Sequence, residues 1–345
     1  MTGPRASLVK PPEPPALEAG FRRRHLLDLD DFSAGEIRAL LDAAAGMRAA
    51  LARPGVRLDQ LRGRTLVNLF YENSTRTRVS FELAGKHLGA DVVNVTASGS
   101  SVAKGESLID TVRTLRALGA DLVVMRHSQS GAPDLVARHT DAAVVNAGDG
   151  WHAHPSQALL DLFTMEQHLG RMAGRRVAIV GDIQHSRVAR SNLWALTAVG
   201  AEVVLCGPPT LVPAQLAALA TARPTPDGAL RRIRIEHHLE AALPDADVIM
   251  VLRLQRERQA AGLLPSLREY ATRYGLNARR LALARPGALV MHPGPMNEGV
   301  EIASEVAHGP ASLIEQQVTN GIAMRMAILD LLLRARAEIG AHADA

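Results

Sequence analysis

The sequence predicts an α/β protein built from two parallel-sheet domains with an interdomain active-site cleft. Three observations lead to this prediction: a length of 345 residues, short β-rich segments that alternate with helical ones, and polar motifs placed directly after the β-rich segments. Single cores stop growing at about 250–300 residues, so the length favours two domains. Strands that alternate with helices form βαβ units and therefore parallel sheets.

The first half opens with a helix and continues as strand–helix repeats. Ser33 is followed by Glu36 and by apolar residues at helical spacing, the pattern of a capping box at a helix start. The strands that we expect next are 65–71, 91–96, 121–126 and 142–147. The helices that follow them are expected to begin at Arg76 and to cover 108–118, 133–139 and 155–168.

The second half repeats this rhythm. Its expected strands are 176–182, 201–206, 232–237, 247–252 and 288–293, and a closing helix over about 312–336 follows the last of them. We expect this helix to cross back onto the first domain. The predicted organisation is an N-terminal arm (1–20), a first domain (21–155, completed by 312–345) and a second domain (156–311).

Composition narrows the class of protein. Hydrophobic residues make up 47% and charged residues 21%, as in soluble globular proteins, and no apolar stretch reaches the roughly 18–20 residues of a membrane span. We therefore expect a cytoplasmic protein that does not bind membranes. The net charge of +4 comes from scattered basic residues and aromatics are only 3%, which argues against nucleic acid and favours small anionic substrates. The single cysteine, Cys206, excludes a disulfide framework or a CxxC site and fits a small buried side chain.

Residues 74–78 (STRTR) follow the first expected strand and open a helix. Hydroxyls, free backbone N–H groups and guanidinium groups at a helix N-terminus bind phosphate through hydrogen bonds, the helix dipole and charge. The alternative is an ordinary Ser/Thr cap with solvated arginines. Two arginines among three hydroxyls favour the phosphate site.

Other polar groups follow other expected strands. Arg126 ends the third strand, and His154 and Gln157 open the helix after the fourth. In open parallel sheets, ligands bind beyond the carboxyl ends of the strands, so we expect these side chains to share one site with residues 74–78.

In the second half, Arg187 follows one expected strand, and Arg253 with Gln255 follows another. Planar guanidinium groups at such places suit dicarboxylates. The neighbouring Val-Gly-Asp at 180–182 lacks the GxGxxG pattern, so a dinucleotide site is poorly supported.

Together these motifs resemble the aspartate and ornithine carbamoyltransferase family over about residues 22–335. The resemblance rests on 74–78, on Asn-Ala-Gly-Asp-Gly at 146–150 with His-Pro-x-Gln at 154–157, on 252–258 (LRLQRER) and on His-Pro-x-Pro at 292–295. It implies transfer of a carbamoyl group from carbamoyl phosphate to an amine by direct attack, without metal or cofactor. The first domain (21–155) would bind carbamoyl phosphate, and the second domain (156–311) would bind the amino acid.

The segment 252–258 also indicates which amine is accepted. Ornithine enzymes carry an Asp-x-x-x-Ser-Met-Gly loop and a His-Cys-Leu-Pro motif, whereas this chain has an arginine-rich segment and His-Pro-Gly-Pro. The resemblance therefore implies L-aspartate as the acceptor and a role in pyrimidine biosynthesis. A sister enzyme that uses another amine, such as an acylated ornithine, and a silent scaffold for pyrimidine-pathway enzymes stay open as alternatives.

The resemblance implies a role for each site residue. Carbamoyl phosphate is expected to contact Ser74, Thr75, Arg76, Thr77, Ser101, Arg126, His154, Gln157, Gly294 and Pro295. Aspartate is expected to contact Lys104, Arg187, Arg253 and Gln255. The expected catalytic residues are Arg76, Thr77, Lys104, Arg126 and His154.

Ser101 and Lys104 stand in a Gly/Ser-rich loop, 98–106, and are expected to reach the active site of a neighbouring subunit. The adjacent Ser100 is an alternative to Ser101. A shared site implies an oligomer, which we expect to be a homotrimer. The sequence leaves open whether a regulatory chain or a dihydroorotase binds. It also leaves open the effect of Glu298, which stands where many relatives have arginine.

Overall fold

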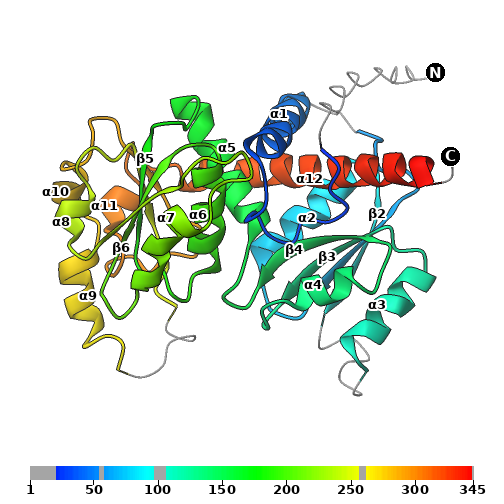
Figure 1. Ribbon diagram of the computed structural model, residues 1–345, viewed down its shortest axis with the longest axis horizontal. Helices are drawn as coiled ribbons and strands as arrows, with labels where there is room; N and C mark the ends of the chain where they lie inside the picture. Colours follow the sequence, from blue (N-terminus) through cyan, green and yellow to red (C-terminus); the bar gives the residue numbers. More distant parts are fainter. Residues whose placement is uncertain (1–20, 54–57, 97–105, 256–261, 344–345) are drawn as a thin grey trace, which may run out of the picture.

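The computed structural model describes residues 21–53, 58–96, 106–255 and 262–343 and contains two separate β-sheets (Figure 1). The first sheet has the strand order β2-β1-β3-β4 and the second the order β7-β6-β5-β8-β9. All neighbouring strands in both sheets run parallel. The predicted fold class is therefore confirmed. The expected arm at 1–20 and the loop with Ser101 and Lys104 lie outside the described residues.

The first half has the expected order of elements. They are α1 (Ala34–Leu51), β1 (Thr65–Phe70), α2 (Thr75–His87), β2 (Asp91–Thr96), α3 (Leu108–Ala117), β3 (Leu122–His127), α4 (Ala132–Ala137), β4 (Ala143–Asp149) and α5 (Pro155–Leu169). The predicted capping box is present at α1, where Ser33 Oγ accepts from the backbone of Glu36 and the Glu36 carboxylate accepts from the backbone of Ser33. This exchange satisfies two backbone donors at the helix start.

The second half contains the expected strands and several short helices that the sequence did not predict. The elements are β5 (Arg176–Val180), α6 (Arg187–Ala198), β6 (Glu202–Cys206), the 3-10 helix η3 (Ala214–Ala218), α7 (Leu219–Ala222), β7 (Arg232–Glu236), α8 (Leu239–Ala242), β8 (Val248–Val251), α9 (Leu267–Tyr274), α10 (Ala278–Leu281), β9 (Leu289–Met291), α11 (Ser304–Ala307) and α12 (Ile314–Ala343). Strand β9 stops short of the expected 293 because Pro293 has no backbone N–H for the ladder. Cys206 is fully buried and burial raises its pKa to about 12, which confirms the buried thiol.

Each sheet has one point at which the direction of strand addition reverses. In the first sheet this point lies between β1 and β3, and in the second between β5 and β8. The crevice beyond the carboxyl ends of such strands is where open α/β sheets bind ligands. The fold thus creates two candidate binding crevices, one per sheet.

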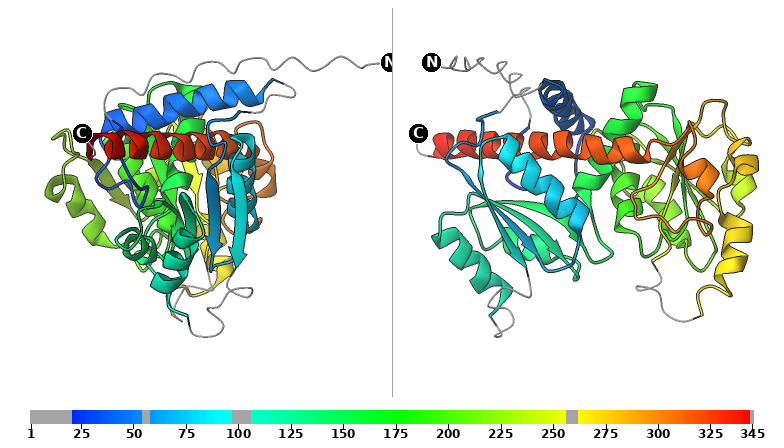
Figure 2. Two further views of the ribbon diagram at one scale, coloured as in Figure 1. Left: turned by 90° about the vertical axis from the view of Figure 1, so that its right-hand side faces the viewer. Right: turned by 180° about the vertical axis from the view of Figure 1, so that it is seen from behind.

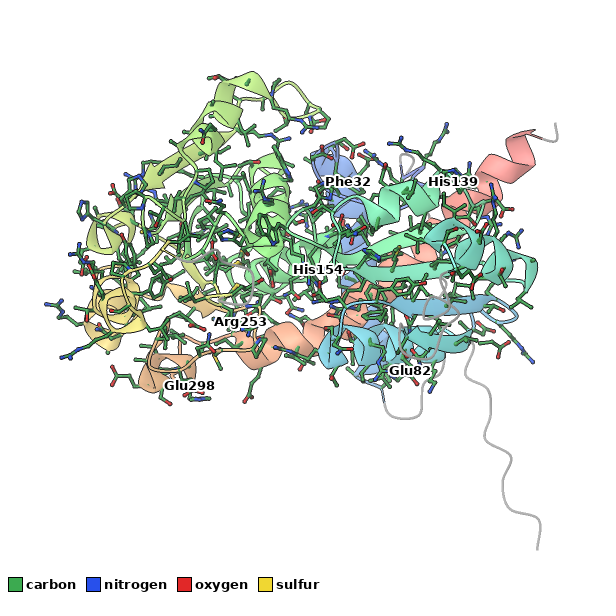
Figure 3. All side chains as sticks on the ribbon, turned by 90° about the horizontal axis from the view of Figure 1, so that it is seen from below. Phe32, Glu82, His139, His154, Arg253 and Glu298 are labelled. Carbon is green, nitrogen blue, oxygen red and sulfur yellow. The ribbon has the colours of Figure 1, made fainter. Side chains whose placement is uncertain are left out.

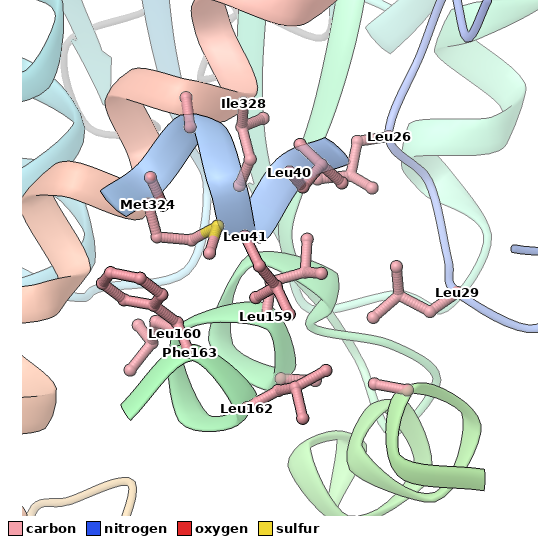
Figure 4. Packing of buried hydrophobic residues seen from close by; sticks show 14 of the residues in the cluster. Leu26, Leu29, Leu40, Leu41, Leu159, Leu160, Leu162, Phe163, Met324 and Ile328 are labelled. Carbon is pink, nitrogen blue, oxygen red and sulfur yellow. The ribbon is translucent and has the colours of Figure 1, made fainter. Parts of the chain in front are cut away.

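The closing helix α12 joins the two halves. It contacts α1, α2 and α5 of the first half and β9 of the second, and Figure 2 shows it running across both. Figure 4 shows side chains of α1, α5 and α12 packed together, among them Leu41, Phe163 and Met324. The helix therefore packs against elements of both halves of the chain. Among the helices described, none is both long and apolar enough to span a bilayer.

Candidate active site

A cleft of about 920 Å³ lies where the carboxyl ends of the two sheets face each other. Twelve of the predicted site residues line it: Ser74, Thr75, Arg76, Thr77, Arg126, His154, Gln157, Arg187, Arg253, Gln255, Gly294 and Pro295. Figure 3 shows His154 and Arg253 near the middle of the molecule, between its two halves. The structure therefore brings together every predicted site residue that it describes; Ser101 and Lys104 fall in an undescribed segment.

The loop after β1 ends in the N-cap of α2. Ser74 is the cap, and its Oγ accepts from Thr77 N at 3.4 Å and donates to Thr77 Oγ1 at 3.0 Å. Thr75 and Arg76 stand in the first turn and line the cleft. Unpaired N–H groups, hydroxyls and one guanidinium are thus gathered at the positive end of a helix, an arrangement that binds phosphate.

Glu72 joins the two sides of the cleft. Its Oε1 accepts from Arg126 Nη2 of β3 and from Arg187 Nη2 of α6, both at 2.5 Å, and its Oε2 accepts from Arg187 Nη1 at 3.1 Å. The same arginines also donate to backbone carbonyls, Arg126 to Ala147 and Arg187 to Gly150. One carboxylate therefore orients an arginine from each half of the chain, and both arginines line the same cleft.

Two glycines permit this close approach of elements. A Cβ on Gly148, which has a φ of +115°, would lie 2.9 Å from Arg187 Cζ and 3.1 Å from Arg126 Nη1. A Cβ on Gly294, which has a φ of +64°, would lie 2.0 Å from Arg76 Nη1. Gly294 thus lets the guanidinium of Arg76 rest against the turn at 292–295.

His154 and Gln157 sit at the start of α5. His154 is buried, its backbone N–H donates to Ser191 Oγ of α6 at 2.9 Å, and its ring lines the cleft. Gln157 Nε2 donates to the fully buried Asp161 at 2.9 Å. These bonds hold the first turn of α5 against both the cleft and the second half.

The turn at 292–295 is held by buried polar groups. His292 Nδ1 accepts from Gly294 N at 2.8 Å, while His292 N donates to Gln317 Oε1 of α12 at 3.0 Å. Glu298 lies farther along this segment and contacts Ser304 and His308 rather than any cleft residue. Glu298 therefore does not belong to the described lining of the cleft.

The cleft is strongly cationic. Its described lining contains five arginines, Arg76, Arg126, Arg187, Arg253 and Arg325, and Glu72 as its one carboxylate. Burial lowers the pKa of Arg76, and it also lowers that of the fully buried Arg325, to about 10. Both groups are still charged at neutral pH, so the cleft favours ligands with several negative charges. Within the described ranges, no group of three or more His, Cys, Asp or Glu side chains is placed to hold a metal ion.

Sequence reasoning did not select Glu72, Trp151 and Arg325 of the cleft lining, nor the buried Asp161. Glu72 stands two residues before the phosphate loop and could have been noticed as a carboxylate at the same strand end. Trp151 lines the cleft mouth and packs edge-on against His185 of the second half, with ring centroids 4.8 Å apart. Arg325 of α12 and Asp161 of α5 carried no local signal, because charged residues in helices are usually solvated.

Comparisons with known proteins agree with this geometry. Residues 24–167 match the family described as aspartate/ornithine carbamoyltransferase, carbamoyl-P binding domain, and residues 173–332 match its Asp/Orn binding domain. The aspartate carbamoyltransferase catalytic subunit of Roseiflexus castenholzii is 61% identical over 311 residues, which cover 90% of this chain and 95% of that protein.

Solved structures show the same fold. Aspartate transcarbamoylase from Trypanosoma cruzi in complex with N-(phosphonacetyl)-L-aspartic acid has a TM-score of 0.79 at 33% identity, covering 90% of this chain and 96% of that one. Ornithine carbamoyltransferase from Pyrococcus furiosus has a TM-score of 0.80 at 29% identity, covering 89% and 96%. The chain therefore belongs to the aspartate/ornithine carbamoyltransferase family.

Proposed function

We propose that the chain joins carbamoyl phosphate to L-aspartate and releases N-carbamoyl-L-aspartate and phosphate, a step of pyrimidine biosynthesis. The observation that carries this proposal is the cationic cleft, in which five arginines face one carboxylate. Both proposed substrates are anions. The side chain of ornithine is a cation, and Arg187 and Arg253 would repel it. The relatives named aspartate carbamoyltransferase, 55–61% identical, support the same acceptor.

The two substrates are assigned to the two sides of the cleft. Carbamoyl phosphate binds in the crevice of the first sheet, within 21–155, where its phosphate accepts hydrogen bonds from Ser74, Thr75, Arg76 and the N-terminus of α2. Aspartate binds on the side of the second sheet, within 156–311. Its carboxylates pair with Arg187, Arg253 and Gln255, which follow the two strands at the reversal point of that sheet.

The reaction is one direct displacement. The neutral α-amine of aspartate attacks the carbamoyl carbon, a C–N bond forms, the C–O bond to phosphate breaks, and the departing phosphate accepts the amine proton. Thr77, Arg126 and His154 stabilise the negative charge that develops on the carbamoyl oxygen. The backbone carbonyl groups of Gly294 and Pro295 accept hydrogen bonds from the attacking amine and from the carbamoyl NH2. The cleft contributes chiefly by holding two mutually repelling anions in line.

A product assay tests this function. Purified protein is incubated with labelled carbamoyl phosphate and, in separate reactions, with L-aspartate, L-ornithine or N-acetyl-L-ornithine. We expect labelled carbamoyl-aspartate alone. A product from either ornithine compound, with none from aspartate, would contradict the assignment of the acceptor.

We further propose a cytoplasmic homotrimer in which Ser101 and Lys104 of one subunit complete the site of the next. Val79 and Leu83 of α2 and Val93 of the edge strand β2 are exposed, and such apolar exposure suits a subunit interface. Ser101 of the neighbour would contact carbamoyl phosphate, and Lys104 of the neighbour would contact aspartate.

Hybrid trimers test the shared site. Arg76→Ala and Lys104→Ala chains, each nearly inactive alone, are dissociated and reassembled together. Each mixed trimer has one junction with intact Arg76 and intact Lys104, so random mixing restores about a quarter of all sites. Verified hybrids that stay inactive would contradict a site shared in this way.

A further inference from the structure

Asp161 is a buried carboxylate that has no role in the reaction proposed above. It lies in α5, one turn after Gln157, and its side chain is fully buried. Its Oδ1 accepts from Gln157 Nε2 at 2.9 Å and from Gln317 Nε2 at 2.7 Å. Its Oδ2 accepts from Asn192 Nδ2 at 3.0 Å. Three side-chain amides therefore converge on one carboxylate.

These amides come from three helices that build the cleft. Gln157 belongs to α5, Gln317 to α12 and Asn192 to α6, the helix that begins at Arg187. Gln317 also links Asp161 to the turn at 292–295, because its Oε1 accepts a hydrogen bond from the backbone N–H of His292. Asp161 thus ties Gln157 to parts of the cleft wall that lie far apart in the sequence.

The charge of Asp161 fixes the orientation of these amides. Burial raises its pKa to about 6, against the opposing effect of the hydrogen bonds from Asn192, Gln317 and Gln157 and of the charge on Arg325. At neutral pH it is therefore an ionised carboxylate, which can accept hydrogen bonds but cannot donate them. Gln157 must turn its NH2 group to Asp161, so its carbonyl oxygen is left for the cleft that it lines.

We propose that Asp161 is a positioning residue that holds the carbonyl oxygen of Gln157 towards the cleft, so that the site selects an acyl phosphate whose acyl group carries N–H donors. The inference rests on the proposed function. A carbamoyl group offers its NH2 to this oxygen, whereas the acetyl group has a methyl in the same place and leaves the oxygen unpaired. A site built to pair with an N–H rejects the analogue that lacks it, because its own polar group is left without a partner.

A purely structural Asp161 predicts something different. In that case its removal would lower stability and weaken all phosphate ligands alike. Discrimination between carbamoyl phosphate and acetyl phosphate is therefore the decisive measurement, and the rise of the thermal unfolding midpoint with ligand concentration gives both affinities without any turnover.

The experiment compares wild type with Asp161→Ala and Asp161→Ser. Alanine leaves room for water, and a serine hydroxyl donates as readily as it accepts, so neither dictates the orientation of Gln157. We expect the ratio of carbamoyl phosphate to acetyl phosphate affinity to fall by roughly 3–10-fold in both, the size of one neutral hydrogen bond. Gln157→Ala should lower the ratio equally, and Asp161→Ala added to it should lower the ratio no further.

Asn192→Leu is the matched control. It removes a donor to the same carboxylate but leaves the bond to Gln157, so it should lower the unfolding midpoint and keep the wild-type ratio. An unchanged ratio in both Asp161 variants, or an equal fall in Asn192→Leu, would overturn the proposal. If neither Asp161 variant folds, Gln157→Ala carries the test, and a wild-type ratio in that variant would overturn the proposal.

The outcome is separable from that of the proposed function. A wild-type protein that makes no carbamoyl-aspartate would remove the proposed function, yet the ligand ratios would still report on Gln157. Conversely, an active wild type with unchanged ratios in the variants would remove only the role of Asp161.

Discussion

The two walls of the cleft bind anions in different ways. On the first-sheet side, the groups proposed to hold phosphate come from consecutive residues, 74–76, at the N-terminus of α2. On the second-sheet side, Arg187 and Arg253 follow different strands, β5 and β8, which adjoin only because the order of the sheet reverses there. A single helical turn can thus supply the ligands of a phosphate. A site for an amino acid with two carboxylates depends instead on the strand order of the sheet, which brings distant residues together.

The largest effect is expected from the phosphate wall. Arg76→Ala should lower kcat by roughly 10²–10³-fold, because the charge on the leaving phosphate loses its counter-charge in a partly buried site. Arg78→Ala, in the same helix but outside the cleft lining, is the control and should be nearly normal. Steady-state kinetics and thermal unfolding of both variants check this. Near-wild-type turnover of Arg76→Ala at saturating substrates would remove the phosphate assignment.

A smaller effect, confined to aspartate, is expected from a substitution on the second-sheet side of the cleft. Arg253→Ala should raise KM for aspartate by roughly 10–100-fold, the size of a lost charged hydrogen bond, and leave the Kd of carbamoyl phosphate nearly unchanged. Arg285→Ala, which removes an arginine paired with Asp247 at the amino end of β8, is the control. Calorimetry with carbamoyl phosphate and kinetics with aspartate measure the two constants. The assignment of substrates to sheets would be reversed if only carbamoyl phosphate binding were lost.

Glu72 belongs to both walls, so its substitution should affect both substrates. In Glu72→Gln, one of the two acceptor oxygens is replaced by NH2, and Arg126 and Arg187 lose their common anchor. We expect both KM values to rise together by roughly 3–10-fold, about one hydrogen bond each. Glu82→Gln, on the surface of α2 beside Lys86, is the control. A change confined to one substrate would show that Glu72 serves one wall only.

The sequence predicted the parts of the site that are formed by neighbouring residues better than the parts that depend on the fold. The loop 74–78, the strand ends and the arginines after them were predictable, because each lies next to a recognisable strand or helix start. The bonds of Asp161 were not, since its partners Asn192 and Gln317 are 31 and 156 residues away. The short helices α7–α11 were also missed, because segments of four to eight residues carry too little periodicity.

The smallest effect concerns a charge pair outside the cleft lining. Hydrogen bonds to Asp149 and Asp28, partly opposed by burial, raise the pKa of His152 from 6.5 to about 10. A raised histidine pKa stabilises the folded state fully below pH 6.5, and this contribution is lost as the pH rises towards 10. The difference in unfolding free energy between wild type and His152→Gln should therefore shrink over that range in chemical denaturation. A constant difference would contradict the pairing, and both KM values should stay normal.

The central claim is that phosphate binds at the first sheet and the aspartate carboxylates at the second. The most direct test is a crystal structure of this protein with N-(phosphonacetyl)-L-aspartic acid, the ligand named in the trypanosomal complex. We predict the phosphonate at the N-terminus of α2, within hydrogen-bonding distance of Ser74, Thr75 and Arg76, and the two carboxylates against Arg187 and Arg253. A ligand bound in the reverse direction, or outside the cleft, would contradict the account.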